Sequence, residues 1–125
     1  MNKEKQMVNL YLDDRRDCPE GFVLARNMDE AITVFSNYTV NMLSLDHDLG
    51  EDENKKLLPS GQDFVKYFCE KGLHANKIYI HTDNGPGREA MYQTLKAARK
   101  RGFIASDIEI YHYSITVNKY SDYEE

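Results

Sequence analysis

The sequence predicts an α/β protein with a mainly parallel, five-stranded sheet. Short apolar runs typical of strands alternate along the chain with longer segments in which apolar residues recur at helical spacing. Parallel neighbours need crossover connections, and these are right-handed, so the alternation favours a parallel sheet with helices on both faces. Three of the predicted strands also end in polar and acidic residues. Because open sheets of this class bind ligands beyond the carboxyl ends of their strands, we expect the functional site there.

Length and composition indicate one domain, 1–125, with a core of about 7–114 and a polar tail at 115–125. No apolar run approaches the roughly 20 residues that a membrane span needs, and the opening MNKEKQ is polar. We therefore expect a cytoplasmic protein without a membrane partner. The two cysteines lack the number and spacing of a disulfide framework or zinc site. A formal charge of −5 disfavours an extended nucleic-acid surface but allows a small phosphorylated ligand.

The first half of the chain predicts three strands and one helix. Apolar residues alternate in 7–14, which ends in two aspartates, and 22–26 fits a short second strand. The segment 27–38 has an amphipathic helical pattern and opens with a capping-box pair. The apolar run 40–46 lacks clean alternation, which is typical of a strand covered on both faces.

The second half predicts two further helices and two further strands. A charged loop leads to a helix that opens at Ser60 and stops near Gly72. A strand over 76–84 and a helix over 85–102 follow, and 107–117 supplies the final strand.

Acidic residues gather at the ends of the first and third strands. Each carboxylate raises the cost of ionising its neighbours, and a divalent cation would offset that repulsion. Oxygen ligands suit Mg²⁺, which also accepts phosphate oxygens. We therefore expect Mg²⁺ or another divalent cation on Asp13, Asp14, Asp46 and Asp48. Without the cation, at least one carboxyl should titrate well above its ordinary value, and Asp13→Asn should raise the melting temperature.

The acidic pair after the first strand and the aspartate after the third resemble the response-regulator receiver domain. In that family the three acids hold Mg²⁺ and the third accepts a phosphoryl group, which would make Asp46 the acceptor. The Lys-Pro that usually follows the last strand of a receiver is missing, because EIYHYS stands there. The last helix of a receiver is missing as well.

Four blocks resemble a more particular family, the cyclic-phosphate processing receiver-like domain. They are LYLDDRRDCPEGFVLARNMDEAI, SLDHDLG, SGQDFV and IHTDNGPGREAM, which together span Leu10 to Met91. Four blocks in order with fitting spacing are far more specific than any one of them. The resemblance implies a receiver-like, flavodoxin-like three-layer sandwich whose first crossover helix is shortened or missing.

The family name implies a phosphoesterase that hydrolyses a cyclic phosphate on a nucleotide, a nucleotide derivative or an RNA end. Such a reaction needs an activated water, protonation of the leaving oxygen and charge stabilisation at phosphorus. His47 and His81 follow two different strands, so acid and base could approach from two sides. With Asp46, they are the expected catalytic residues.

Phosphate binding is expected from residues beside the first strand and at the start of the last helix. Arg15 and Arg88 are candidate clamps, and Asn84 would orient the phosphate. Amide groups around Gly87 would add donors, because helix N-termini favour anions.

Two other functions stay open at this stage. A non-catalytic module could bind a phosphorylated ligand or a partner protein through the same pocket and would form no product. A phosphoacceptor receiver would carry acid-labile phosphate on Asp46.

Overall fold

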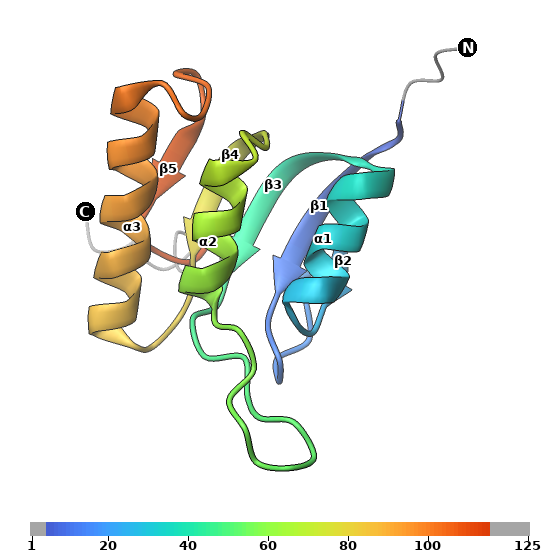
Figure 1. Cartoon of the computed structure of the whole chain (residues 1–125). Coiled ribbons are helices and arrows are strands. Elements are labelled where there is room, and N and C mark those ends of the chain that lie inside the picture. The colour runs from blue at the N-terminus through green and yellow to red at the C-terminus, as the bar shows by residue number, and fades with distance from the viewer. Residues whose placement is uncertain (1–4, 116–125) are drawn as a thin grey trace, which may run out of the picture.

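The computed structural model describes residues 5–115, which form a five-stranded parallel sheet. Its strands are β1 (Met7–Leu12), β2 (Phe22–Ala25), β3 (Thr39–Leu45), β4 (Ala75–Ile80) and β5 (Glu109–Tyr111), in the order β2-β1-β3-β4-β5 (Figure 1). Every neighbouring pair is parallel. The predicted α/β, receiver-like fold is therefore confirmed. The fifth strand is shorter than expected, and the end of the predicted segment lies outside the described residues.

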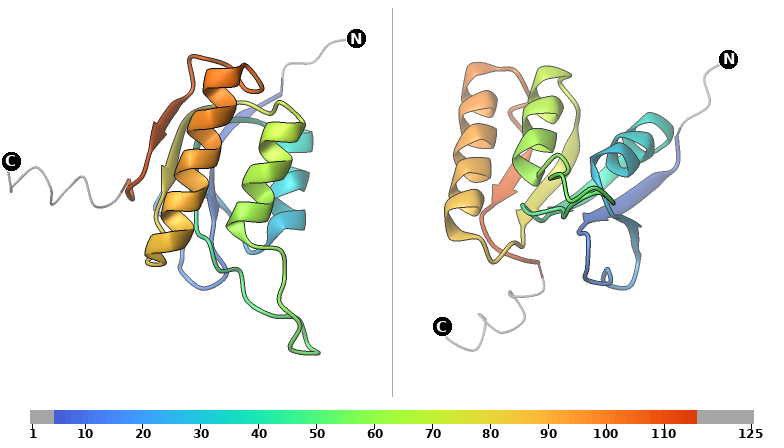
Figure 2. Two further views of the ribbon diagram at one scale, coloured as in Figure 1. Left: turned by 60° about the vertical axis from the view of Figure 1, so that its left-hand side comes forward. Right: turned by 60° about the horizontal axis from the view of Figure 1, so that its bottom comes forward.

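Three helices connect the strands: α1 (Met28–Asn37), α2 (Gly61–Glu70) and α3 (Gly85–Arg101). Residues 13–21, between β1 and β2, form no helix, which agrees with the expected shortened or missing first crossover helix. The helices α1, α2 and α3 lie in the crossovers β2–β3, β3–β4 and β4–β5, which all lead in the same direction across the sheet. Because such crossovers are right-handed, the three helices lie on one face of the sheet (Figure 2). In the described part of the chain, no helix covers the other face, so the second helical layer of the predicted sandwich is not found there.

The helix ends follow local sequence signals. The Ser60 side chain accepts from the Asp63 amide and Asp63 accepts in return, which completes the predicted capping box of α2. For α1, Asn27 accepts from the amide of Glu30, but the Glu30 carboxylate accepts from the preceding Arg26 amide. These caps fix where α1 and α2 begin.

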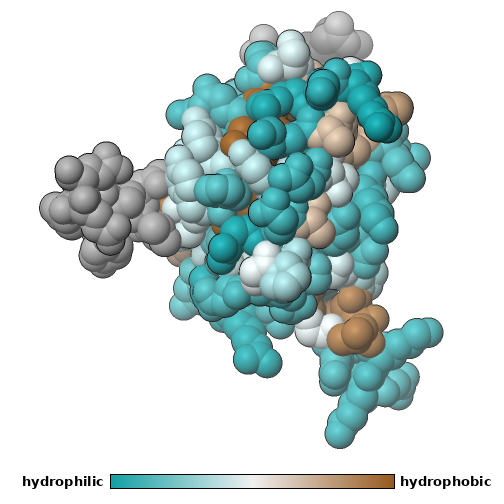
Figure 3. Space-filling view, turned by 90° about the vertical axis from the view of Figure 1, so that its left-hand side faces the viewer, coloured by the Kyte–Doolittle hydropathy of each residue, from teal (hydrophilic) through white to brown (hydrophobic). Residues whose placement is uncertain are grey.

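The core lies between the sheet and the helices. The largest of its fully buried side chains include Leu10, Leu12, Leu43, Leu45, Phe64, Phe68, Ile78, Ile80, Met91 and Leu95. On the face of the molecule that α3 and β5 cover, hydrophobic residues appear only in scattered spots (Figure 3). No helix in residues 5–115 has the length and apolar character needed to cross a bilayer.

The sheet face away from the helices carries aromatic rings. Tyr11 stacks on His81 with 4.2 Å between ring centroids, and Tyr79 stacks on Tyr111 at 4.9 Å. Tyr11 and Tyr79 are nearly buried, at 4% and 7% exposure. On this face of the sheet, aromatic side chains of β1, β4 and β5 therefore pack against neighbouring rings.

Candidate active site

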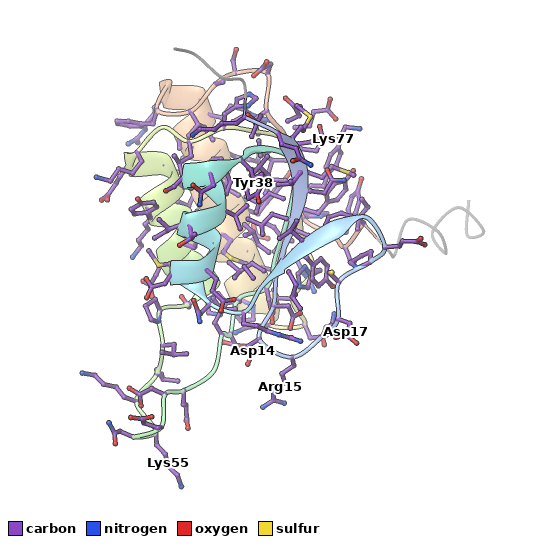
Figure 4. The ribbon with its side chains drawn as sticks, turned by 90° about the vertical axis from the view of Figure 1, so that its right-hand side faces the viewer. Asp14, Arg15, Asp17, Tyr38, Lys55 and Lys77 are labelled. Atoms are coloured by element: carbon purple, nitrogen blue, oxygen red, sulfur yellow. The ribbon has the colours of Figure 1, made fainter. Side chains whose placement is uncertain are left out.

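The predicted acidic residues surround one cavity of about 510 Å³ at the carboxyl ends of β1 and β3. In the sheet, β2 lies on one side of β1 and β3 on the other, so the strand order reverses between β1 and β3. Ligands of open α/β sheets bind at such points. The cavity is lined by Asp13, Asp14, Arg15, Arg16, Asp46, Asp48, Gly50, Thr82, Asp83 and Asn84. Figure 4 shows Asp14 and Arg15 at this end of the domain.

Asp13 is held by three hydrogen-bond donors. Its Oδ1 accepts from the backbone amides of Arg15 and Arg16, at 2.8 and 2.9 Å, and its Oδ2 lies 2.9 Å from Nε2 of His81. Only 1% of Asp13 is exposed. Burial by itself would raise the pKa of Asp13, but the two amides and the His81 ring outweigh it and lower the pKa. Asp13 is therefore a fixed carboxylate anion.

His81 lies behind Asp13, with no exposed side-chain surface. Its Nδ1 is 2.7 Å from the Ser44 hydroxyl, and Tyr11 stacks on its ring. Burial lowers the pKa of His81 against the opposing attraction of Asp13, so the ring is neutral. Since the Asp13 anion can only accept, Nε2 carries the proton and Ser44 donates to Nδ1. Both ring nitrogens are thus engaged.

Asp46 follows β3, and its pKa is shifted in the opposite direction to that of Asp13. Its Oδ1 accepts from the amide of His47 at 2.8 Å. Burial raises the pKa of Asp46, and repulsion from Asp13 and Asp14 adds to this, against hydrogen bonds from the His47 amide and Thr82. The direction expected for one carboxyl of the cluster is found for Asp46, whose pKa is raised, whereas the pKa of Asp13 is lowered.

His47 lies beside the cavity and is paired with a cavity residue. Its Nδ1 is 2.9 Å from Oδ1 of Asp48, whose Oδ2 accepts from Nδ2 of Asn84 at 3.3 Å. The hydrogen bond with His47 lowers the pKa of Asp48. An Nδ1–H that donates to Asp48 leaves the lone pair on Nε2, and no group in residues 5–115 forms a hydrogen bond with that nitrogen. The His47 side chain is 21% exposed.

The first turn of α3 accommodates the His47 ring. A β-carbon at Gly87 would lie 2.6 Å from two carbons of that ring, which is closer than real contacts allow. The amide of Gly87 donates to Oδ1 of Asn84 at 2.9 Å, so this predicted phosphate donor is already bonded within the helix cap. Asn84 thus caps α3 with one side-chain atom and contacts Asp48 with the other.

The donor set at the cavity fits a divalent cation. Ligand atoms of Asp13, Asp46 and His81 lie within 4.8 Å of one another, and within the described residues neither Asp14 nor Asp48 joins this group. Both of those carboxylates nevertheless line the same cavity. His81 already uses both nitrogens, so the oxygens of Asp13 and Asp46, with Asp14 beside them, are the better candidates for a hard cation.

The predicted phosphate-binding arginines are not brought together. Arg15 extends from the rim, with 89% of its side chain exposed. Arg88 donates to the carbonyl oxygen of Thr82 at 2.8 Å and lines a neighbouring cavity of about 520 Å³ instead. Arg16 lies between the two cavities, and its guanidinium is 2.7 Å from a carboxylate oxygen of Asp83.

Sequence reasoning missed the roles of Ser44, Arg16 and Tyr11. Ser44 carried a signal, since a serine inside an otherwise apolar buried strand needs a hydrogen-bond partner. Arg16 and Tyr11 carried none, because an arginine in a charged loop and an aromatic residue in a strand are both ordinary.

The sheet order, the acidic strand ends and the cavity at the point of strand reversal define a receiver-like domain. The pattern of one family, the cyclic-phosphate processing receiver domain, matches residues 8–97. The chain therefore belongs to the cyclic-phosphate processing receiver domain family. No curated protein and no solved structure matched the chain.

Proposed function

We propose that this protein is a phosphoesterase that hydrolyses a cyclic phosphate on a nucleotide, nucleotide derivative or RNA end. The observation that carries the proposal is one cavity at the carboxyl ends of β1 and β3 in which Asp13, Asp14 and Asp46 lie beside Arg15 and Arg16. Carboxylates beside arginines suit a cation and the phosphate oxygens that it would bind. Membership of the family suggests a role in cyclic-phosphate processing.

In this proposal Asp13, Asp14 and Asp46 hold the cation, and Asp48 lines the same cavity. When bound, a divalent cation supplies positive charge for the phosphate oxygens. Arg15, from the exposed rim, and Arg16, between the cavities, orient the phosphate.

His47 is the proposed proton-transfer residue. Pairing of its Nδ1 with Asp48 fixes the tautomer that leaves a lone pair on Nε2, as a general base requires. The proton that His47 takes from the attacking water is then available for the leaving oxygen, so Asp46 acts only as a cation ligand. His81, which the sequence placed as the partner of His47, acts in this proposal through Asp13, because its side chain has no exposed surface.

The test is a panel of cyclic phosphates incubated with the full chain, with and without Mg²⁺ or Mn²⁺, with product measured by chromatography. Turnover that depends on the metal is expected. On any substrate the wild type cleaves, His47→Ala should lose about 10²- to 10⁴-fold in rate. If no cyclic phosphate gives product, the proposed function is contradicted. Full activity in His47→Ala would contradict the role of His47.

One observation favours a second candidate, a module that binds a phosphorylated ligand without cleaving it. Both ring nitrogens of His81 are engaged, so a second histidine is not available for proton transfer in this arrangement. A binding module would retain ligand affinity in His47→Ala and never form product. Affinity and turnover measured on the same cyclic phosphate distinguish the two functions.

A further inference from the structure

A second cavity adjoins the acidic one and has no role in the chemistry above. Its volume of about 520 Å³ falls within the roughly 300–1,000 Å³ of small-molecule sites. Arg16, Thr82 and Asp83 line both cavities, so a ligand could extend from one to the other across the Arg16–Asp83 ion pair. The second cavity also lies at the carboxyl ends of β4 and β5, on the ligand-binding edge of the sheet.

The two cavities differ in chemistry. Four aspartates line the first alone, whereas His112 and Tyr113 give the second two aromatic rings. Tyr113 is 37% exposed, and its carbonyl oxygen accepts from the amide of Ile80, which fixes this segment beside β4. The His112 ring lies 4.8 Å from that of Tyr92. Fixed, partly exposed aromatic rings are typical stacking surfaces for nucleobases.

Arg88 supplies hydrogen-bond donors to the same cavity. One guanidinium nitrogen, Nη2, donates to the Thr82 carbonyl oxygen. A guanidinium has five N–H donors, so other donors of Arg88 remain for a sugar or base oxygen. Aromatic rings beside polar donors suit a nucleoside better than a purely apolar group.

We propose that the second cavity binds the nucleoside moiety of the substrate, with the base against Tyr113 and His112, while the cyclic phosphate lies in the acidic cavity. This inference rests on the proposed function and deepens it. It assigns Tyr113 and His112 to substrate selection and Arg16 to the junction between the two subsites.

Adenosine is the first probe, because it carries no phosphate and tests the second cavity alone. Titrated into the full chain, it should shift the backbone amide resonances of residues 112–114, 85 and 87–89 in ¹⁵N NMR spectra. Tyr113→Ala should weaken this binding by a factor of about 5 to 100, whereas Tyr113→Phe keeps the ring and should bind as the wild type does. His112→Ala should weaken binding in the same direction.

Tyr38→Ala is the matched control, because Tyr38 is also 37% exposed. It lies away from the end of the domain that carries Asp14 and Arg15 (Figure 4). This variant should bind adenosine as the wild type does. Adenosine binding that is absent, that shifts other residues, or that survives both Tyr113→Ala and His112→Ala would overturn the inference.

A kinetic comparison separates this inference from the proposed function. A cyclic nucleotide should have a lower KM than glycerol cyclic phosphate, which lacks a base. Tyr113→Ala should raise the KM for the cyclic nucleotide and leave that for glycerol cyclic phosphate unchanged. Equal KM values for the two substrates would leave the phosphoesterase intact and remove the nucleoside subsite. Adenosine binding without turnover of any cyclic phosphate would instead retain the subsite and contradict the phosphoesterase.

Discussion

At the level of single residues, the carboxyl groups of Asp13 and Asp46 differ in what surrounds them. Asp13 accepts three hydrogen bonds, which stabilise its anion although it is buried. Asp46 is partly buried and repelled by both Asp13 and Asp14, and its hydrogen bonds do not compensate. The cost of gathering negative charge at this edge therefore falls mainly on Asp46.

The first prediction concerns these two residues. Without metal at pH 7, Asp46→Asn should raise the melting temperature, because a carboxyl whose folded pKa is raised destabilises the fold once it is ionised. Asp13→Asn should instead lower stability by about 1–3 kcal/mol, since Asn cannot satisfy the same three donors. From the sequence, Asp13→Asn was expected to raise the melting temperature, whereas the hydrogen bonds of Asp13 in the structure predict that it lowers it.

Thermal unfolding in EDTA, and again with Mg²⁺ or Mn²⁺, checks both variants. Added metal should stabilise the wild type and have little effect on Asp46→Asn. Equal melting temperatures for Asp46→Asn and wild type in EDTA would contradict the destabilisation of the ionised Asp46 by burial and repulsion.

The second prediction concerns Ser44, which is completely buried. Ser44→Ala removes the donor to Nδ1 of His81 and leaves that nitrogen buried without a partner, at a cost of about 1–3 kcal/mol in the free energy of unfolding. Urea denaturation measures the change. Ser36→Ala is the control, because the Ser36 hydroxyl is exposed and bonds within its own helix, so its effect should stay within about 0.5 kcal/mol. Similar values for the two variants would mean that the Ser44–His81 bond adds nothing.

At the level of secondary-structure elements, α3 positions the site through its first turn. Asn84 caps the helix and also contacts Asp48, and Gly87 leaves room for the His47 ring. The start of α2 has a similar constraint, because a β-carbon at Gly61 would lie 2.0 Å from the Asp46 carbonyl oxygen. Both helices therefore approach the loop after β3 as closely as glycine permits.

The third prediction tests this contact. Gly87→Ala should displace the His47 ring, break its pairing with Asp48 and lower the turnover of any cyclic phosphate that the wild type cleaves. Shifted ring resonances of His47 in NMR spectra would show the displacement directly. Gly85→Ala is the matched control in the same turn, since nothing lies within 4 Å of its β-carbon position, and it should leave the His47 signals unchanged. Unchanged His47 signals in Gly87→Ala would rule out the steric role.

At the level of the whole molecule, stability should depend on pH through the buried His81. The folded pKa of His81 is lowered from its ordinary 6.5, so the unfolded chain binds its proton first as the solution is acidified. The fourth prediction is that the free energy of unfolding falls as the pH drops below 6.5 in metal-free protein. Asp46 acts in the opposite sense, because its raised folded pKa makes protonation favour the fold.

The measurement is therefore made in the Asp46→Asn background, by urea denaturation at a series of pH values. Replacing His81 as well, by His81→Gln, should remove the loss that begins at pH 6.5. A decline that persists unchanged in the His81→Gln variant would assign it to other groups.

Much of this architecture was predictable because its signals are local. Strand and helix periodicity, the Ser60–Asp63 capping box and the acids at the ends of β1 and β3 depend on residues close together in the sequence. Parallel strands bring their carboxyl ends to one edge, so the convergence of Asp13 and Asp46 followed from the fold class alone.

The tertiary structure alone decided what each of these side chains contacts. Whether a histidine after a strand is open or buried depends on partners far along the chain, such as Ser44 and Asp13 for His81. The side of α3 that carries Arg88, and hence its cavity, likewise follows from packing of the helix against the sheet. By itself the sequence determined the fold class, the edge of the sheet and the residues that meet there. Burial and long-range hydrogen bonds, which set the proton affinities of Asp13, Asp46 and His81, exist only in the folded chain.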